Sequence, residues 1–477
     1  MKRPKYIWII GLAITIAIIV IPMVIFLPKA SGKSDDPWAT LPERPSHVDH
    51  TSLIEGPFET GSDVTQRCLE CHTEAGEQML QSVHWTWESK EYEIEGRTEP
   101  VTIGKKNSLN NFCIGIQSNW PGCTSCHAGY GWEDENFDFS RTENIDCLVC
   151  HEQTGTYVKS KSGLPAEGVD LISVAQSVGY PDRDNCGGCH FAGGGGNAVK
   201  HGDLDEHLFN PSESIDVHMG GNDFVCTDCH QAENHQISGR AISVSLDTEN
   251  QIYCTDCHSE MLHEDDRINT HVQSVACQTC HIPAGAVKDP TKMYWDWSTA
   301  GQDLPEDPHT YLKIKGSFVY EGDFVPEYYW YSGIKDRYLL GDEIDPLQPT
   351  VMNTPAGDID DPNAKIWPFK VHRAKQPYDT VNNYLLQPKT VGEGGFWTDF
   401  DWDQALRLGS DVVGLDYSGE YNFTETEMYW PISHMVTPIE EALQCDDCHG
   451  EVGRLDWQAL GYPGDPIAWG GRTLIEP

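Results

Sequence analysis

One short motif, Cys-x-x-Cys-His, occurs eight times in this chain and constrains its fold more than any other feature. The chain has 17 cysteines and 20 histidines among 477 residues, and composition alone predicts far fewer than one chance copy. The cysteine pairs are Cys68 and Cys71, Cys123 and Cys126, Cys147 and Cys150, Cys186 and Cys189, Cys226 and Cys229, Cys254 and Cys257, Cys277 and Cys280, and Cys445 and Cys448. The histidines that follow them are His72, His127, His151, His190, His230, His258, His281 and His449. Eight copies of one motif indicate eight copies of one binding site.

The spacing of the motif suits covalent attachment of haem c. Two thiols three positions apart can add to the two vinyl groups of one haem, and the adjoining histidine then becomes the proximal ligand of the iron. Zinc ribbons also use Cys-x-x-Cys pairs, and exported proteins use cysteines in disulfides. Neither alternative requires a histidine after every second cysteine. The sequence therefore predicts eight covalently bound haem c groups, each with its iron held by a motif histidine.

The amount of protein available for each haem limits the fold. Only 39% of the residues are hydrophobic and the mean hydropathy is −0.47, so a core built from side chains alone would be small for this length. Haems supply the missing apolar volume, and haems packed this densely come into edge contact. We therefore expect a multihaem cytochrome c fold, mostly helix and irregular coil wrapped round a stacked haem array, with few short strands. Alternating residues at 312–320 indicate one such strand.

The motifs divide the chain into four parts. Residues 1–30 are expected to form a transmembrane anchor or an uncleaved signal, and residues 31–60 a tether. Residues 61–281 carry seven motifs. Residues 282–477 form an aromatic-rich wrapping region that carries the eighth motif, after a stretch (282–444) without any cysteine. Because that stretch must fold back over the array, we expect the last two parts to form one continuous haem domain.

The N-terminus carries a membrane signal. Ile7 to Leu27 is a run of 21 residues without a charge, long enough to cross a bilayer as a helix. Lys2, Arg3 and Lys5 precede it and should stay on the cytoplasmic side. A cleaved signal peptide is the alternative, although its apolar region is usually shorter and its cleavage site richer in small residues. The expectation is a membrane-anchored protein with its haem domain on the periplasmic, extracytoplasmic side.

The charge balance restricts the partners. The formal net charge is −42, from 74 acidic and 32 basic residues. Such a field argues against nucleic acid as a partner and favours docking to a basic redox protein, although a solvated acidic surface explains it equally well. The expected partners are a small inorganic substrate and an electron donor, either a quinol dehydrogenase or a c-type cytochrome. An oligomer is compatible with the sequence.

Twelve histidines lie outside the motifs and are candidates for the second axial position of the irons. They are His47, His50, His84, His201, His207, His218, His235, His263, His271, His309, His372 and His434. Several lie shortly before or after a motif, which suits local ligation. Because twelve histidines are enough for eight bis-histidine haems, counting alone does not reveal a catalytic iron.

One cysteine, Cys113, lies outside every motif, ten residues before Cys123. It is either a buried structural cysteine or a thiol beside a reactive haem.

Several stretches around these residues resemble the octahaem tetrathionate reductases, octahaem c-type cytochromes related to hydroxylamine oxidoreductase-like multihaem proteins. The resemblance covers nearly the whole chain after the N-terminal segment. It rests on Ser82-Val83-His84-Trp85-Thr86-Trp87, Asn111-Phe112-Cys113-Ile114, Cys123-Thr124-Ser125-Cys126-His127-Ala128-Gly129-Tyr130, the stretch 193–204 from the glycine run through Lys200 to Leu204, and Val371-His372-Arg373-Ala374-Lys375-Gln376-Pro377-Tyr378. Octahaem nitrite reductases with a Cys-x-x-Cys-Lys motif are excluded, because all eight motifs here end in histidine.

The resemblance implies one active-site haem with a lysine as its distal ligand and a cysteine nearby. Carried over by motif, that haem is attached to Cys123 and Cys126 above His127, with Lys200 as the distal ligand and Cys113 as the nearby thiol. His372 is then a residue of the substrate pocket. The other seven haems would be bis-histidine, with distal ligands His50, His84, His218, His235, His263, His271 and His434.

The resulting hypothesis is an oxidoreductase that reduces tetrathionate and/or nitrite and hydroxylamine at the lysine-ligated haem. The alternative is a membrane-anchored electron conduit without a substrate of its own, and oxidation of hydroxylamine is a weaker third interpretation. Anionic substrates require local cations in so acidic a chain. The candidate cations are Lys105, Lys106, Lys200, His372, Arg373 and Lys375. Clustering of these residues about one haem would favour an anionic substrate.

Overall fold

The computed structural model describes residues 37–473, except residues 45, 241, 243–244, 247–249 and 260. The chain divides into two compact units. The smaller unit combines the described residues up to Glu43 with Tyr253–Leu262, and it contains the sixth motif, formed by Cys254, Cys257 and His258. The larger unit comprises Arg44–Ile252 and the chain from His263 onward, with the other seven motifs.

The expectation of a membrane-anchored localisation is corrected by the structure. Within the described ranges, no helix has the length and apolar character needed to cross a bilayer. The segment Ile7 to Leu27, on which that expectation depended, lies outside the described residues. Anchoring by an N-terminal helix therefore has no structural support.

Helices are short because most motifs are themselves single helical turns. In α9 (Cys226–Cys229) and α14 (Cys445–Cys448), the aspartate before the second cysteine accepts the backbone N–H that precedes the helix, at 2.7 Å in both cases. This capping box closes the turn locally and presents both cysteines from it. The other α-helices are α2 Gly61–Leu69, α3 Ala75–Leu80, α4 Val83–Thr86, α5 Trp120–Cys123, α6 Leu148–His151, α7 Leu171–Gln176, α8 Arg183–His190, α10 Asp266–His271, α11 Cys277–His281, α12 Phe396–Asp399, α13 Trp402–Val413 and α15 Pro466–Trp469. Short 3-10 helices are η1 Pro37–Thr40, η2 Thr124–Cys126, η3 Thr142–Asn144, η4 Lys161–Gly163, η5 Glu206–Phe209, η6 Cys254–Asp256, η7 Trp297–Thr299 and η8 Ile439–Glu441.

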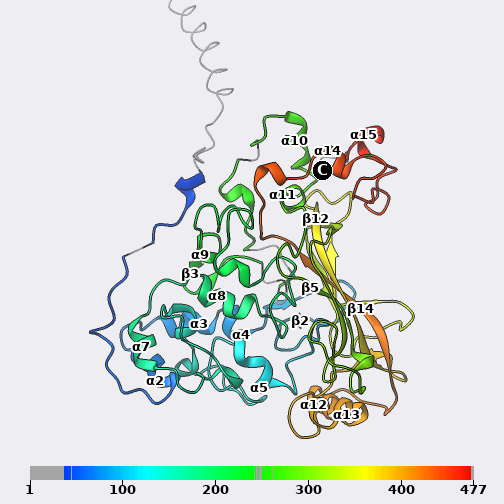
Figure 1. Ribbon diagram of the computed structural model, residues 1–477. Helices are drawn as coiled ribbons and strands as arrows, with labels where there is room; N and C mark the ends of the chain where they lie inside the picture. Colours follow the sequence, from blue (N-terminus) through cyan, green and yellow to red (C-terminus); the bar gives the residue numbers. More distant parts are fainter. Residues whose placement is uncertain are drawn as a thin grey trace, which may run out of the picture. The chain divides into compact units, whose positions relative to one another are not determined.

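An eight-stranded sheet occupies the region between the seventh and eighth motifs (Figure 1). Its order is β10-β14-β12-β5-β7-β6, and β8 and β13 also pair with β12. The long strand β12 (Lys365–Asp379) runs antiparallel to β14 (Tyr421–Pro431), from Phe369 opposite Pro431 to Asp379 opposite Tyr421, and parallel to β5 (Thr291–Asp296). The remaining strands of this sheet are β6 Tyr311–Leu312, β7 Gly316–Glu321, β8 Glu327–Tyr331, β10 Thr350–Val351 and β13 Tyr384–Leu385. Two-stranded pairs are formed by β1 Glu91–Tyr92 with β2 Val101–Thr102, β3 Ala232–Glu233 with β4 Gln236–Ile237, and β9 Gly333–Arg337 with β11 Asn353–Ala356.

This sheet overturns the expectation of a mostly helical fold with few short strands. Helices make up only a minority of the described residues, whereas β12 and β14 are long strands. Among residues 365–374 of β12, all but Lys365 and Arg373 are buried, on both faces of the strand. A strand buried on both faces lacks the alternation of apolar and polar residues that reveals strands in a sequence. The multihaem cytochrome character of the fold is retained.

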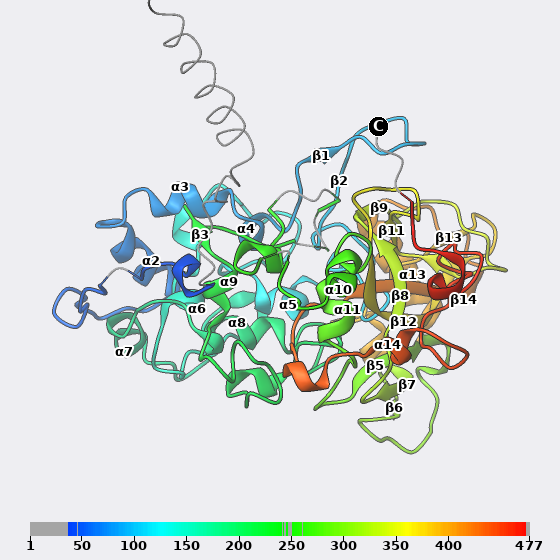
Figure 2. The ribbon, with the colours of Figure 1, turned by 90° about the horizontal axis from the view of Figure 1, so that it is seen from above.

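Within the larger unit, hydrophobic residues of the motif-bearing region pack against hydrophobic residues of the sheet. Figure 2 shows the helices of the early motifs on one side of this unit and the strands of the sheet on the other. Leu109 and Phe112, from the segment before the second motif, pack with Val371 of β12 and Trp430 of β14. The core therefore places the segment around Cys113 directly against the sheet.

Asn119 provides a test of this junction. Its buried Oδ1 accepts hydrogen bonds from the N–H and hydroxyl of Thr390 (2.7 and 2.8 Å), and its Nδ2 donates to the carbonyl of Pro388 (3.1 Å). Asn119→Ala leaves these groups buried without partners, which should lower the free energy of unfolding by about 2–4 kcal/mol. Urea unfolding followed by haem absorbance measures the change. Asn136→Ala, at an exposed position, should change it by less than about 0.5 kcal/mol, and equal effects of the two changes would contradict the assignment.

Candidate haem sites and active site

Five motif histidines face a second histidine across a gap of constant width. The ring centroids of these pairs lie 6.1–6.3 Å apart. The pairs are His72 with His50, His190 with His84, His230 with His434, His281 with His263 and His449 with His271. Two metal–imidazole bonds of about 2 Å each, together with the ring radii, span about 6 Å. The gap is thus the right width for one iron between two imidazoles, and all five second histidines are among the predicted distal ligands.

Five of these histidines, His230, His263, His271, His434 and His449, have a hydrogen-bond partner at Nδ1, which orients an axial ligand. The partners are mostly uncharged, such as the carbonyl oxygens of Ser238 for His230 (2.9 Å) and Arg267 for His271 (2.7 Å). Two histidines have carboxylate partners instead. Asp203 accepts from Nδ1 of His434 (3.0 Å), and Asp465 lies 2.6 Å from Nδ1 of His449.

The remaining predicted ligands have other surroundings. His151 lies 3.0 Å from the Gly179 carbonyl through Nδ1, and His235 lies 3.0 Å from the Gln78 side chain through Nδ1. His151 also lowers the pKa of His235, after burial, so the two rings are near each other. His218 packs beside Phe224, with ring centroids 5.8 Å apart. His258 belongs to the smaller unit.

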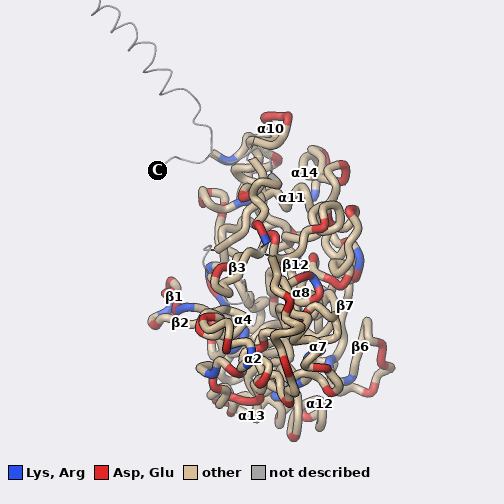
Figure 3. The backbone as a smooth tube through the Cα atoms, turned by 90° about the vertical axis from the view of Figure 1, so that its left-hand side faces the viewer, with Lys and Arg blue, Asp and Glu red and all other residues tan. Residues whose placement is uncertain are grey.

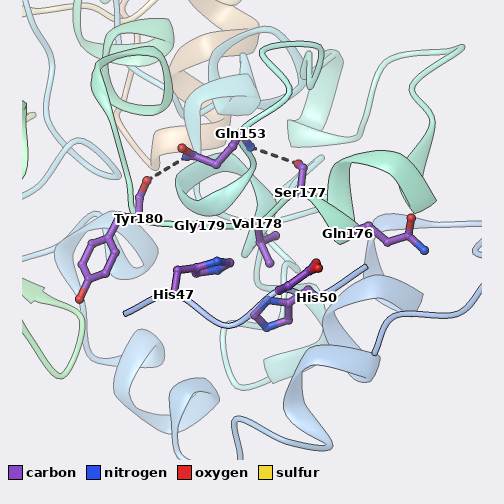
Figure 4. Close-up of a pocket in the computed structure, with 9 residues that line it drawn as sticks. His47, His50, Gln153, Gln176, Ser177, Val178, Gly179 and Tyr180 are labelled. Atoms are coloured by element: carbon purple, nitrogen blue, oxygen red, sulfur yellow. Dashed lines mark hydrogen bonds between the residues drawn. The ribbon is translucent and has the colours of Figure 1, made fainter. Parts of the chain in front are cut away.

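A cavity of about 520 Å³ adjoins the first of these pairs (Figure 4). His47 and His50 line it on one side and Gln153, Val178 and Tyr180 on another. Nδ1 of His50 is buried there without a hydrogen-bond partner among the described residues. The cavity thus adjoins one histidine of the His50–His72 pair, and neither Cys113 nor Lys200 lines it.

Sulfur atoms of different motifs approach one another in the larger unit. Cys126 interacts with Cys189 and Cys186 with Cys226. These thiols represent the sulfur atoms that become thioethers when haem is attached. The second, fourth and fifth motifs therefore form a continuous series.

Three of the motif cysteines, Cys71, Cys229 and Cys445, are exposed. In the smaller unit, Cys257 accepts a hydrogen bond at its Sγ atom from the hydroxyl of Thr40 (3.0 Å). The assignment of each haem to its own pair of cysteines stays a prediction from the motif.

The second motif differs from the five histidine pairs. His127 is fully buried, and its Nε2 lies 2.6 Å from the carbonyl oxygen of Trp85. A carbonyl oxygen only accepts, so Nε2 carries the ring proton in this arrangement. The rings that surround it at 4.9–6.0 Å are aromatic: Trp85, Trp87, Trp132, Phe137 and Phe139. His127 therefore has a backbone carbonyl rather than a second histidine at its ring nitrogen, and its role as an iron ligand stays a prediction.

Lys200 lies near the same motif. Its Nζ is 4.9 Å from the ring centroid of Trp430 and 5.8 Å from that of Phe112, and it interacts electrostatically with Cys126. Burial, and then repulsion from Lys105, lowers the pKa of Lys200 to about 7. A lysine binds a metal only as the neutral amine, so this environment favours the form that can act as a ligand.

Cys113 lies between the second motif and the sheet. Its charge would raise the pKa of Cys123, an effect second only to burial, so the two thiols are near each other. It also interacts with Lys292 of β5, whose Nζ lies 3.3 Å from the Phe112 carbonyl and 3.4 Å from the Trp295 ring centroid. Burial lowers the pKa of Lys292 to about 7. The thiol thus faces a buried lysine.

His372 lies on β12 beside this lysine and is fully buried. Neither of its ring nitrogens has a hydrogen-bond partner among the described residues, and the Oδ1 atom of the neighbouring Asn111 has none either. Asn111 Nδ2 donates to the backbone carbonyl of His372 (2.7 Å). Burial, then Lys370 and Lys292, lowers the pKa of His372 well below its usual value. Buried, unpartnered polar groups of this kind mark a place for a ligand.

Only some of the six cations expected near the active site lie there in the structure. Lys105 and Lys200 influence the second motif, and the backbone carbonyl of His372 accepts a hydrogen bond from Asn111, in the segment before that motif. Lys106 instead pairs with Glu88 (3.2 Å). Arg373 pairs with Glu327 and Glu427 (2.7 and 3.0 Å), and it shares with Lys375 the opposite face of β12 from His372.

Two further basic residues, Lys292 and Lys370, were not predicted from the sequence. Lys370 precedes His372 by two positions on β12 and therefore shares its face of the strand. That spacing could have identified Lys370 once β12 was known to be a strand. No spacing signal connects Lys292 with Cys113, which lies 179 positions earlier in the chain.

Comparison with known proteins agrees with these features. Family models described as cytochrome c bacterial and as cytochrome c7 and related cytochrome c match residues 292–452 and 211–282. The crystal structure of octaheme cytochrome c from Shewanella oneidensis is similar with a TM-score of 0.83 and 50% sequence identity, over 88% of this chain and 98% of that one. An uncharacterized protein from Archaeoglobus fulgidus is 25% identical over 246 residues, 41% of this chain and 82% of that protein. The prediction of eight covalently bound haem c groups is confirmed.

The carboxylate beside His434 generates a prediction about one haem. Hydrogen bonding to a carboxylate makes a ligating imidazole more electron-donating, which stabilises the oxidised iron. Asp203→Asn should therefore raise the reduction potential of the haem attached to Cys226 and Cys229. EPR-monitored redox titration measures the shift, and Asp205→Asn, a buried neighbour that contacts the non-motif His207, should leave it unchanged. Superimposable titrations of Asp203→Asn and the wild type would contradict the prediction.

Proposed function

Because this chain belongs to the octahaem cytochromes c, we propose that it is a reductase of a small inorganic substrate, with its active site at Lys200 beside the second motif. The proposed substrates are tetrathionate and/or nitrite and hydroxylamine. The observation that carries this proposal is the engagement of His127 with the Trp85 carbonyl, in contrast to the five motif histidines that face a second histidine. A haem with one protein ligand keeps a position for substrate.

The chain's residues have distinct roles in this proposal. Lys200 would hold the iron of the haem attached to Cys123 and Cys126, and paired histidines would hold the others, with His235 serving the haem at His151. The haems, when bound, supply electrons to the site one at a time. The electron donor would be a quinol dehydrogenase or a c-type cytochrome with a basic docking surface, since the chain carries a net charge of −42.

Cys113 suits the cleavage of a sulfur–sulfur bond. A thiolate attacks such a bond readily, and a nearby cation favours the thiolate. Attack by Cys113 on tetrathionate would release one thiosulfate and leave the second bound to the cysteine as a mixed disulfide. Two electrons then release that thiosulfate and restore the thiolate. Lys292, which faces Cys113, would stabilise both the thiolate and the incoming anion.

The charge distribution favours an anionic substrate. Acidic positions occur throughout the view in Figure 3, so an anion approaching the protein is repelled in general. The site differs, because Lys105, Lys200 and Lys292 lie around it and Lys292 forms no ion pair with a carboxylate among the described residues. His372, buried and unpartnered, would donate a hydrogen bond from its neutral ring to the bound substrate.

Rapid kinetics test the proposal. The protein, reduced without oxygen, is mixed with tetrathionate, nitrite or hydroxylamine, and haem reoxidation is followed by stopped-flow absorbance. Lys200→His should slow reoxidation by every true substrate by roughly 100-fold or more, the scale of losing one catalytic group. Cys113→Ala should do so for tetrathionate and leave hydroxylamine nearly unaffected, because only the former needs a sulfur nucleophile. Slow reoxidation by all three compounds, unchanged in both variants, would instead support an electron conduit.

Lys292 gives the reaction a pH dependence. Its ammonium form is present below a pKa of about 7 and is lost as the pH rises through that value. The KM for tetrathionate should therefore increase from pH 6 to pH 8, while Lys292→Met should raise KM roughly tenfold at pH 6 and flatten the profile. Lys375→Met, on the opposite face of β12 from His372, should preserve the wild-type profile. An unaltered slope in Lys292→Met would assign the titration to another group.

A further inference from the structure

The loop that carries Lys200 is fastened to the sheet through its backbone carbonyl groups. The hydroxyl group of Thr291, at the start of β5, lies 2.6 Å from the carbonyl oxygen of Ala198 and 2.9 Å from that of His201. Thr291 is completely buried. These contacts hold the loop on either side of Lys200.

Lys370 of β12 supplies the hydrogen bonds to the two loop residues between Ala198 and His201. Its Nζ lies 2.9 Å from the Val199 carbonyl oxygen, 3.1 Å from the Lys200 carbonyl oxygen and 2.5 Å from the Thr291 hydroxyl oxygen. All three atoms act as acceptors, because the hydroxyl hydrogen of Thr291 is directed at the loop. The three hydrogens of an ammonium group would match these three acceptors, and the neutral amine, which burial favours by lowering the pKa of Lys370 well below its usual value, still donates two.

The hydrogen-bond partners of Lys370 distinguish its role from those of the other buried lysines. The residue is fully buried, and each of its hydrogens already has a partner inside the protein. A substrate anion or a haem propionate could reach Nζ only by displacing one of these partners. Lys292, by contrast, has a single hydrogen bond among the described residues, to the Phe112 carbonyl. Lys370 therefore acts on the loop, whereas Lys292 can act on a ligand.

The loop needs such support because its backbone is strained and tightly packed. Ala198 has a φ of +57°, a left-handed conformation that costs a residue with a side chain about 1 kcal/mol or more. Gly202 lies so close to β12 that an added Cβ would be 3.3 Å from the Cβ of Lys370 and 3.0 Å from the Phe324 ring. A strained loop in this position keeps its conformation only while its hydrogen bonds hold.

We propose that Lys370 is a positioning residue, which fixes the direction in which the Lys200 side chain leaves the loop and so presents its amine to the iron at Cys123 and Cys126. This inference rests on the proposed function, because it takes Lys200 as the ligand of that iron. His372 lies two residues after Lys370, on the same face of β12. Strand β12 thus fixes the position of the loop that carries Lys200 relative to His372, the buried histidine of the proposed substrate pocket.

EPR spectroscopy of the oxidised, haem-loaded protein tests the inference. The signal of the lysine-ligated iron is first identified as the low-spin component that disappears in Lys200→Met. Lys370→Met, which keeps the length of the side chain but removes its donors, should lose this component and gain a matching high-spin signal. The matched control is Lys375→Met, the same change on the opposite face of the same strand, which should retain it. Pyridine haemochrome assay of each variant should give eight haems.

The outcomes separate the two proposals. A wild-type spectrum without any component that depends on Lys200 contradicts the proposed function itself. A Lys200-dependent component that persists in Lys370→Met, with eight haems bound, overturns only the positioning role. If Lys370→Met fails to fold, Thr291→Val decides, because it removes the hydroxyl that joins Lys370 to the loop without burying a new polar group. A partial loss of the component in that variant supports the role, and an unchanged spectrum overturns it.

Discussion

The covalent attachment of eight haems to one chain is the constraint on which the rest of this structure depends. Most Cys-x-x-Cys-His motifs form their own helical turn, so helices begin and end with the motifs and remain short. Five motif histidines face a second histidine, with ring centroids 6.1–6.3 Å apart. This separation suits one iron between two imidazoles. The protein core is therefore divided into several small clusters around these gaps.

The second motif uses the same attachment chemistry for another purpose. Its histidine is bound to the Trp85 carbonyl within a ring of aromatic side chains, and Lys200 lies near its second cysteine, over the ring of Trp430. The sheet makes this possible, since β5 and β12 hold the backbone of the lysine loop. In the proposed function, strands that bind no haem thus determine which haem can react.

Electrostatics divide the molecule into an acidic exterior field and a basic interior site. The net charge of −42 suits docking of a basic electron donor, but it opposes the entry of an anion. Lys292, buried without a carboxylate partner among the described residues, opposes that field near Cys113 at pH values below its pKa of about 7. Keeping unpaired polar groups buried is costly, and a site that binds an anion offers a physical reason for the cost.

The sequence by itself determined the number of haems and their attachment motifs, because the motif and the carboxylates that cap it act within a few positions of one another. Resemblance to a family directed attention to Lys200, Cys113 and His372. Only the tertiary structure decided the sheet, since β12 is buried on both faces and shows no alternation. It also decided the engagement of His127, which depends on a carbonyl 42 residues away, and the support of Lys200 by Lys370, whose partner Val199 lies 171 residues away. Contacts between such distant residues arise from packing, which no local pattern encodes.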